Sequence, residues 1–152
     1  MSKQLIIIRG PSGTGKSTIA EHLGGQARKN WFEADMFMLD ENGDYCFDHR
    51  KLSECHRTCQ NLTRLAFDQH DTVIVSNTFT TMWELEPYVD IANELDTVVR
   101  IIKTPGPWDI QTLTSRNCHG VPTATIKRFI HSYEPHPTEE KWTNISIFTH
   151  DN

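Results

Sequence analysis

The sequence contains no long hydrophobic run. Its longest aliphatic stretch is Leu5-Ile6-Ile7-Ile8, whereas a helix that crosses a membrane needs about 20 apolar residues. Lys3 precedes this stretch and Arg9 follows it, without the small-residue cleavage site of a signal peptide. We therefore expect a cytoplasmic protein that makes no contact with a membrane.

An excess of positive charge is also missing. The 15 lysines and arginines are outnumbered by 20 aspartates and glutamates, which gives a formal net charge of −5. Broad binding of nucleic acid needs a large basic surface, so this composition argues against it. A local basic pocket for one phosphorylated end is still compatible with the composition, because cations are denser between Arg100 and Arg128.

Cysteine is scarce, with four residues in the chain. A leaderless domain of this size needs no disulfide, so we expect reduced thiols. Cys55-His56-x-x-Cys59 has neither the spacing of a zinc knuckle nor a second ligand pair after it. We prefer the interpretation that these cysteines lie on a helix face, where buried thiols behave as small hydrophobic groups. A metal site is the alternative.

The sequence does contain a regular alternation of aliphatic runs and amphipathic segments. Its 152 residues suit one domain with one core, and we expect residues 1–152 to form that domain. The expected strands cover residues 5–9, 31–34, 72–76, 97–103 and 144–149. The expected helices cover residues 16–28, 50–69, 81–95, 109–118 and 123–134. Such alternation predicts a three-layer α/β fold with a mainly parallel sheet and helices on both faces.

The segment after the second expected strand interrupts this alternation. Asn42-Gly43 is a strong turn signal between Met36–Leu39 and Tyr45–Phe47, and it predicts a small hairpin-like excursion. Three aromatic residues flank this turn: Phe37, Tyr45 and Phe47. We prefer the interpretation that each ring packs the core of the excursion. The alternative is that the rings stack on a nucleobase.

The loop after the first expected strand carries the sharpest motif. Residues 10–17, Gly-Pro-Ser-Gly-Thr-Gly-Lys-Ser, match the full Walker A pattern. Glycines let successive backbone N–H groups turn inward around phosphate oxygens, and the following helix points its positive end at the same anion. We expect Lys16 to neutralise the β and γ phosphates of ATP, and the Ser17 hydroxyl to bind Mg²⁺. The alternative, a glycine-rich turn without catalytic use, is disfavoured by the expected strand before the motif and helix after it.

A kinase also needs a group that orients or deprotonates the attacking hydroxyl. Asp35 follows the second expected strand and is the candidate base, with a solvated loop acid or a turn cap as the alternative. The third expected strand ends in Ser76-Asn77-Thr78, without the acid that GTPases and motor ATPases place there. Because ligands bind at the carboxyl ends of parallel strands, we expect Asp35, Asn77 and Thr78 to contact the acceptor.

A lid is expected over about residues 107–122. Arg116 lies at the end of its helix, where it can meet the charge that develops on the transferred phosphoryl group. The alternative for Arg116 is an ordinary helix-end cation, and for Arg128 a surface role and a site role are equally suitable. The predicted catalytic residues are Lys16, Asp35 and Arg116. The predicted nucleotide contacts are Gly10, Ser12, Gly13, Thr14, Gly15, Lys16, Ser17, Thr18 and Arg116.

Several blocks of the sequence share the pattern of one family. They are residues 8–18; residues 73–78 with Trp83-Glu84 and Pro87-Tyr88-Val89; and Pro107-Trp108 with Arg116-Asn117-x-His119-Gly120-Val121-Pro122, Ile126 and Tyr133-Glu134. These blocks resemble the kinase domain of bacteriophage polynucleotide kinase and the related Nedd4-binding-protein-type P-loop kinases. The second relative is also matched by Ala34-Asp35-x-Phe37, Tyr45-x-Phe47-Asp48 and His56-x-x-Cys59.

The resemblance implies transfer of the ATP γ-phosphate to a 5′-hydroxyl of DNA or RNA. It implies that Lys16 and Ser17 bind phosphate and metal. It further implies that Asp35 is the general base, that Arg116 is a lid arginine near the ATP phosphates, and that Thr78 lines the acceptor site.

The sequence departs from the family pattern on the acceptor side. Met36 and Met38 stand where the viral enzyme has a second acid and, shortly after, an arginine that contacts the acceptor's phosphate. Phe79 ends a Ser-Asn-Thr-Phe sequence where Asp-Asn-Thr-Asn or Ser-Asp-Thr-Asn is usual. Met38 is therefore either a hydrophobic residue of the hairpin or the mark of a different acceptor.

The sequence thus predicts an ATP- and Mg²⁺-dependent kinase that acts on the 5′-hydroxyl of a polynucleotide, and two alternatives stay open. A kinase for a nucleoside, sugar or other metabolite shares the fold and is favoured by the missing arginine and the net charge of −5. A nucleotide-dependent binding module without kinase activity is disfavoured by the complete Walker A motif and by Asp35. The family permits oligomers, but no exposed stripe in the sequence identifies an interface.

Overall fold

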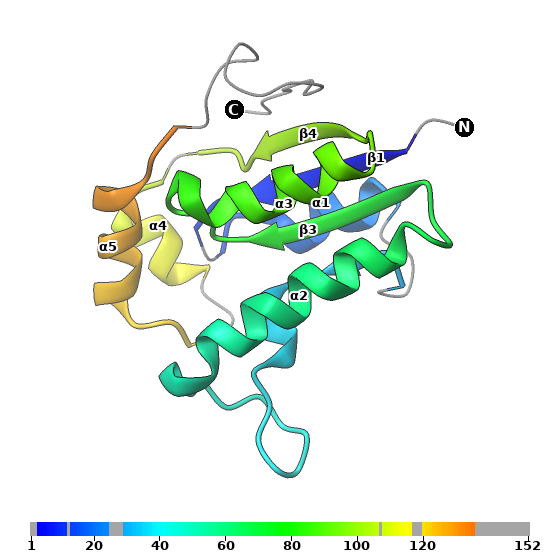
Figure 1. Cartoon of the computed structure of the whole chain (residues 1–152). Helices are drawn as coiled ribbons and strands as arrows, with labels where there is room; N and C mark the ends of the chain where they lie inside the picture. The colour runs from blue at the N-terminus through cyan, green and yellow to red at the C-terminus, as the bar shows by residue number, and fades with distance from the viewer. Residues whose placement is uncertain (1–2, 12, 25–28, 107, 117–119, 136–152) are drawn as a thin grey trace.

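A parallel sheet of four strands forms the centre of the computed structural model of the chain (Figure 1). The structure describes residues 3–11, 13–24, 29–106, 108–116 and 120–135. The strands are β1 (Gln4–Arg9), β2 (Trp31–Phe32), β3 (Thr72–Asn77) and β4 (Val98–Lys103), in the spatial order β2-β3-β1-β4. Arg9 pairs with Asn77 on one side and with Lys103 on the other, so these three strands end level at one edge of the sheet.

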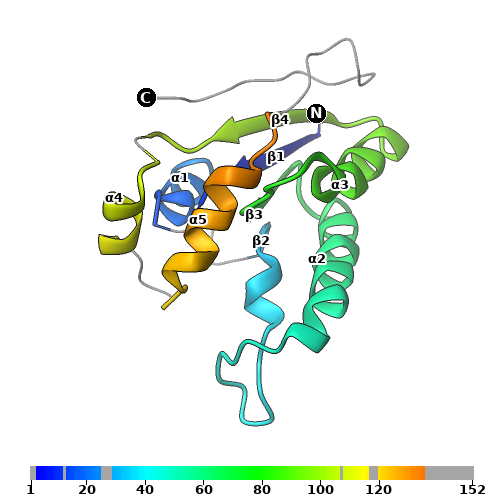
Figure 2. The same cartoon turned by 90° about the vertical axis from the view of Figure 1, so that its left-hand side faces the viewer.

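Helices cover both faces of the sheet, as the alternation of the sequence predicts. They are α1 (Lys16–His22), α2 (Leu52–Ala66), α3 (Met82–Glu94), α4 (Ile110–Ser115) and α5 (Thr123–Ser132), with the short 3-10 helices η2 (Ala34–Phe37) and η3 (His49–Lys51). Figure 2 shows α1 on one side of the sheet and α2 with α3 on the other. None of the helices among the described residues combines the length and apolarity that crossing a membrane requires.

The strands bury their side chains on both faces, which explains their nearly continuous aliphatic sequences. Leu5 and Ile7 join the larger core cluster beneath α2 and α3. Ile6 and Ile8 join a smaller cluster with Ala20 of α1. Successive side chains of a strand point to opposite faces, so one short aliphatic run supplies two cores, and the three-layer α/β prediction is confirmed.

Three expected elements differ from the observed ones. The strand expected over residues 31–34 ends at Phe32, and Ala34 already belongs to η2. The first helix ends at His22 rather than near residue 28, and Gly24 follows it with φ of 102°. The segment Met36–Leu39 is not a strand, because Met36 lies in η2 and the only ladder contact recorded there is an antiparallel bridge between Leu39 and Tyr45. The last expected strand, residues 144–149, lies outside the described residues.

The turn signal inside this excursion is confirmed even though its flanks are not strands. The backbone N–H groups of Asn42 and Asp44 donate to Oδ1 of Asp40 at 2.8 and 3.0 Å. Gly43 takes φ of 84°, which glycine adopts without strain. The carboxylate of Asp40 therefore closes the turn without a pair of flanking strands. The loop hangs below η2 and α2 in Figure 1.

Candidate active site

The phosphate loop leaves the carboxyl end of β1 and leads directly into α1. The Gly10 N–H donates to the Thr78 carbonyl at 3.3 Å, and the Thr104 N–H donates to the Arg9 carbonyl at 3.0 Å. A Cβ added to Gly10 would lie 2.0 Å from Thr104 Oγ1, so glycine is needed there for close packing. The loop is thereby fixed to the residues that follow β3 and β4.

The conformation of the loop suits a bound phosphate chain. Gly13 and Gly15 have φ of 82° and 88°, and a Cβ on Gly15 would have no atom within 4 Å, which shows open space at the start of α1. Lys16 Nζ donates to the carbonyls of Gly10 and Pro11 at 2.9 Å each, so its ammonium lies across the loop. These features fit an anion held by backbone N–H groups and a lysine.

The remaining predicted nucleotide contacts divide into three groups. Thr14 is buried, and its hydroxyl donates to the Pro11 carbonyl at 2.7 Å, so it stabilises the loop from within. Ser17 and Thr18 are exposed in the first turn of α1, where a metal ion and a phosphate can reach their hydroxyls. Ser12 lies outside the described residues.

Arg116 lies against the phosphate loop, as its predicted role requires. It ends α4, and a Cβ built on Gly13 would stand 3.1 Å from the backbone carbonyl carbon and from the Cβ of Arg116. The residue is exposed. At the other end of the helix, Asp109 accepts hydrogen bonds from the N–H and hydroxyl of Thr112 at 2.8 and 2.9 Å, and these bonds lower the pKa of its carboxyl. Asp109 therefore caps the start of α4, and Arg116 at its other end places a cation next to the phosphate loop.

Asp35 lies on η2, one strand away from the phosphate loop. Its residue is exposed, and its helix is tied to β3 because the Ala34 N–H donates to Asn77 Oδ1 at 2.8 Å. Burial raises the pKa of the Tyr45 hydroxyl, and the Asp35 carboxylate nearby raises it further. Thr78, the residue after β3, is also exposed. Asp35 and Thr78 therefore stand at the same edge of the sheet, while the Asn77 oxygen faces the backbone of η2.

Sequence reasoning missed the role of Arg9 at the end of β1. Its side chain is fully buried, and its Nε and Nη2 atoms donate to the carbonyl of Phe79, with a further bond from Nη2 to the Thr80 carbonyl at 3.2 Å. The guanidinium carbon lies 4.3 Å from the centre of the Tyr133 ring. Burial lowers the pKa of this guanidinium, and Tyr133 with the nearby acid Glu84 opposes the shift.

Arg9 thereby joins the loop after β3 to the end of α5. The Glu134 N–H donates to the Thr80 carbonyl, and Glu134 Oε1 accepts from the Met82 N–H, both at 2.9 Å. Figure 2 looks onto the carboxyl ends of the strands, and α5 crosses in front of this edge. A charged residue at the end of an otherwise aliphatic strand was the only signal for this contact in the sequence.

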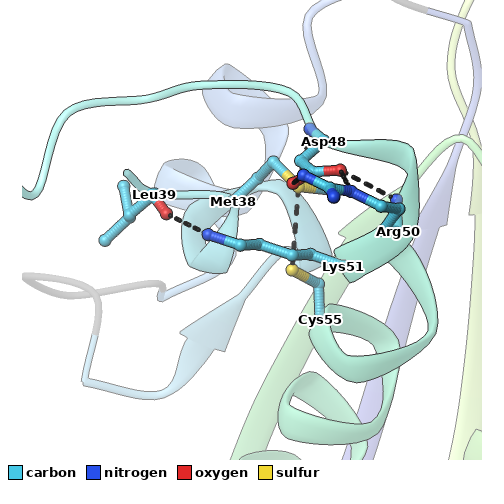
Figure 3. A network of polar contacts seen from close by, with 6 residues as sticks. All are labelled: Met38, Leu39, Asp48, Arg50, Lys51 and Cys55. Atoms are coloured by element: carbon cyan, nitrogen blue, oxygen red, sulfur yellow. Dashed lines mark hydrogen bonds and ion pairs between the residues drawn. The ribbon is translucent and has the colours of Figure 1, made fainter. Parts of the chain in front are cut away.

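The structure buries Met38 inside the excursion. The residue is 1% exposed, its Sδ lies 3.9 Å from Cys55 Sγ, and it accepts from the Asp48 N–H at 3.4 Å (Figure 3). Met38 is therefore a hydrophobic residue that anchors the excursion to α2. The Arg50 guanidinium is paired with Asp48.

The preferred interpretation of the aromatic residues is wrong for two of the three rings. Tyr45 is 54% exposed and Phe47 is 60% exposed, because the loop is too short to enclose them once Met38 occupies its interior. Phe37 is half-buried and packs against the main core cluster. Arg128 of α5 is exposed as well.

Cys55 and Cys59 lie buried on one side of α2, so the helix-face interpretation is confirmed. Burial raises the pKa of the Cys59 thiol to about 11. Within the described part of the chain, no three histidine, cysteine or acidic side chains gather closely enough to hold a metal ion.

Comparison with known proteins gives a consistent assignment. An AAA domain family, AAA_33, matches residues 5–136. NEDD4-binding protein 2 of Homo sapiens is 32% identical over 136 residues, which cover 86% of this chain and 8% of that protein. The chain thus spans less than a tenth of the length of this curated relative.

Solved structures share the fold. A chain of the Pnkp1/Rnl/Hen1 RNA repair complex matches with a TM-score of 0.69 and 20% identity, over 94% of this chain and 47% of that one. An unliganded sugar kinase from Janibacter sp. HTCC2649 matches with a TM-score of 0.64 and 16% identity, over 99% of this chain and 86% of that one. The chain therefore shares its fold with both of these proteins.

Proposed function

The chain belongs to the AAA_33 family of AAA domains, and we propose that this P-loop kinase domain transfers the γ-phosphate of ATP to the 5′-hydroxyl of a polynucleotide. The proposal has a coarse part, phosphoryl transfer to a hydroxyl, and a fine part, the identity of the acceptor. Different observations support the two parts.

One juxtaposition carries the coarse part. A complete phosphate loop follows β1, and the exposed carboxylate of Asp35 follows β2, with β3 between the two strands. Asn77 at the end of β3 holds the helix that carries Asp35. A carboxylate near a phosphate loop suits the deprotonation of an attacking hydroxyl. A switch ATPase, whose nucleophile is water, does not need an acid placed in this way.

The residues of the site have separate roles in this chemistry. Lys16 and Arg116 both lie at the phosphate loop and would oppose the negative charge that develops on the transferred group. Asp35 would orient the acceptor hydroxyl and take its proton. The exposed Ser17 hydroxyl fits a Mg²⁺ ligand, and Mg²⁺ bound with the nucleotide supplies further neutralisation of phosphate charge.

The fine part rests on the surface around Asp35 and on the likeness to a chain of the Pnkp1/Rnl/Hen1 RNA repair complex. Tyr45 and Phe47 stand exposed on the loop that follows η2. Base stacking on such rings contributes roughly 1–3 kcal/mol per base and tolerates any sequence. We therefore expect a kinase that acts on single-stranded ends to expose aromatic rings near its catalytic base.

The test is a transfer assay with γ-labelled ATP, Mg²⁺ and a 5′-hydroxyl oligonucleotide. We expect label on the 5′ end with the native chain and none with Lys16→Ala, because the loop then lacks its cation. Glu21→Ala, at an exposed residue of α1 outside the phosphate loop, serves as the control. Absence of label in the presence of ATP binding would contradict the proposal.

A kinase for a small metabolite is the second candidate, and one observation favours it. Met38 is buried, so the excursion offers no cation at that position for a backbone phosphate. The net charge of −5 is also poorly suited to long nucleic acids. Transfer of label to free nucleosides or sugars, without transfer to oligonucleotides, would select this candidate.

A further inference from the structure

A cavity of about 200 Å³ lies beside the helix that carries Asp35. Its walls come from η2, from the loop that follows it, from the last residue of η3 and from the first two turns of α2. The lining residues are Phe37, Leu39, Lys51, Glu54, Cys55 and Thr58. The volume is below the several hundred Å³ typical of sites for whole cofactors, so the cavity suits one ring system.

The cavity is built by contacts that fix its walls. Lys51 Nζ donates to the Leu39 carbonyl at 3.2 Å and so ties η3, which leads directly into α2, to the loop (Figure 3). Cys55 lies beneath this contact, with Met38 packed against its thiol. An ammonium has three N–H donors, and the bond to Leu39 uses one of them. Lys51 therefore retains donors beside the cavity while holding it open.

The lining combines an aromatic ring and a leucine with three polar groups of different kinds. Phe37 offers a ring face or edge, Lys51 offers donors, Glu54 offers an acceptor and Thr58 offers a hydroxyl. A lone phosphate suits this set poorly because Glu54 is negative. A wholly apolar group suits it poorly because both charges would lose water. A planar heterocycle with donors and acceptors along its edge matches all of these groups.

The cavity is also lined by the helix that carries the candidate base. Phe37 and Asp35 belong to the same four-residue helix. Burial and the Glu54 carboxylate raise the pKa of the Cys55 thiol, and the Asp35 carboxylate contributes in the same direction. Because Phe37 lines the cavity and Asp35 stands two residues before it, the cavity and the candidate base share one short helix.

We propose that this cavity binds the nucleobase of the acceptor nucleotide whose hydroxyl is presented to Asp35. The base packs against Phe37, and its polar edge meets Lys51 and Glu54. This assignment rests on the proposed function, because it takes the acceptor to be a nucleotide. Beyond that function, it names the part of the chain that recognises the acceptor.

Thr58→Trp tests the assignment, because an indole at this half-buried position would fill the cavity. Ser53→Trp is the matched control, since Ser53 lies on the same helix, is exposed and does not line the cavity. Two acceptors are compared: an ordinary 5′-hydroxyl oligonucleotide and one with a 5′-terminal abasic sugar. We expect Thr58→Trp to raise KM for the ordinary acceptor about tenfold or more, and to leave KM for ATP and for the abasic acceptor unchanged.

Direct binding separates failure of this assignment from failure of the proposed function. Free nucleosides are titrated into both variants and the native chain, without ATP, and followed by NMR. Nucleoside binding that Thr58→Trp abolishes and Ser53→Trp preserves supports the assignment even if no oligonucleotide is phosphorylated. Equal binding by both variants, no binding by the native chain, or an equal effect of Thr58→Trp on both acceptors overturns it.

Discussion

Among single residues, Asp35 carries the strongest chemical expectation. We predict that Asp35→Asn lowers kcat by about 10²–10⁴-fold, because an amide cannot accept the proton of the attacking hydroxyl. KM for ATP should not change, since the phosphate loop follows a different strand. Steady-state kinetics measures both quantities. Asp44→Asn, at an exposed acid on the following loop, is the control, and full activity of Asp35→Asn would show that the base lies elsewhere.

The thiols give a prediction of reactivity. Burial raises the pKa of Cys59 to about 11 and also raises that of Cys55, whereas Cys46 is exposed. Only the thiolate reacts with iodoacetamide, and a raised pKa keeps a thiol protonated. At about pH 8 we expect alkylation of Cys46 in the native chain, and of Cys55 and Cys59 only after unfolding. Peptide mass spectrometry reads the labels, and rapid labelling of native Cys59 would refute the buried placement.

The placement of individual candidate residues was predictable where a backbone motif dictates it. Lys16 and Ser17 follow from the Walker A spacing, and Asp35 follows from its place after a strand. Met38 and Tyr45 were not predictable in the same way. A short segment does not reveal which of its side chains turns inward, and that choice depends on Cys55 and Asp48 from a later part of the chain.

At the scale of elements, the strands were predicted more closely than the segments between them. β1 and β3 are aliphatic because both of their faces are buried, so their sequences leave little choice. The first helix is shorter than its pattern indicates because Gly24 takes a left-handed conformation soon after His22. Met36 enters η2 because Ala34 is held by Asn77, a contact between distant residues that no local pattern encodes.

That contact makes Asn77 a positioning residue for the helix that carries Asp35. We predict that Asn77→Ala lowers kcat by about tenfold or more without changing KM for ATP, because the misplacement of a catalytic group is costly. Asn77→Asp keeps an oxygen that accepts from the Ala34 N–H, so it should restore most of the activity. Equal loss of activity in both variants, or an equal rise in KM for ATP, would assign Asn77 a merely structural role.

At the scale of the whole molecule, topology gathers the site. The parallel strands end at one edge, which brings the phosphate loop, Asp35 and Thr78 together from distant parts of the sequence. The end of α5 is fastened to the same edge by Arg9 and Glu134. The alternation of strands and helices predicts the fold class. It does not predict the attachment of α5, because that contact depends on the buried Arg9, which in the sequence is only the residue before the phosphate loop.

The net negative charge of the molecule predicts that its affinity for the acceptor depends only weakly on salt concentration. With a net charge of −5, the acceptor is expected to contact few cations, and Lys103 is occupied in part by the rings of Trp108 and Tyr133, 4.8 and 5.6 Å from its Nζ. Each phosphate contact to a single strand changes the slope of log affinity against log salt by about −0.7. We therefore expect a slope of about −0.7 to −1.4, for one or two contacts.

The measurement is the oligonucleotide KM at saturating ATP and Mg²⁺ between about 50 and 200 mM salt. A free nucleoside, which carries no phosphate, is the control and should show almost no slope. A slope of about −3 or steeper for the oligonucleotide would require at least four phosphate contacts. Recognition would then rest on an extended track of cations along the strand, rather than on the terminal nucleotide held between the cavity and Asp35.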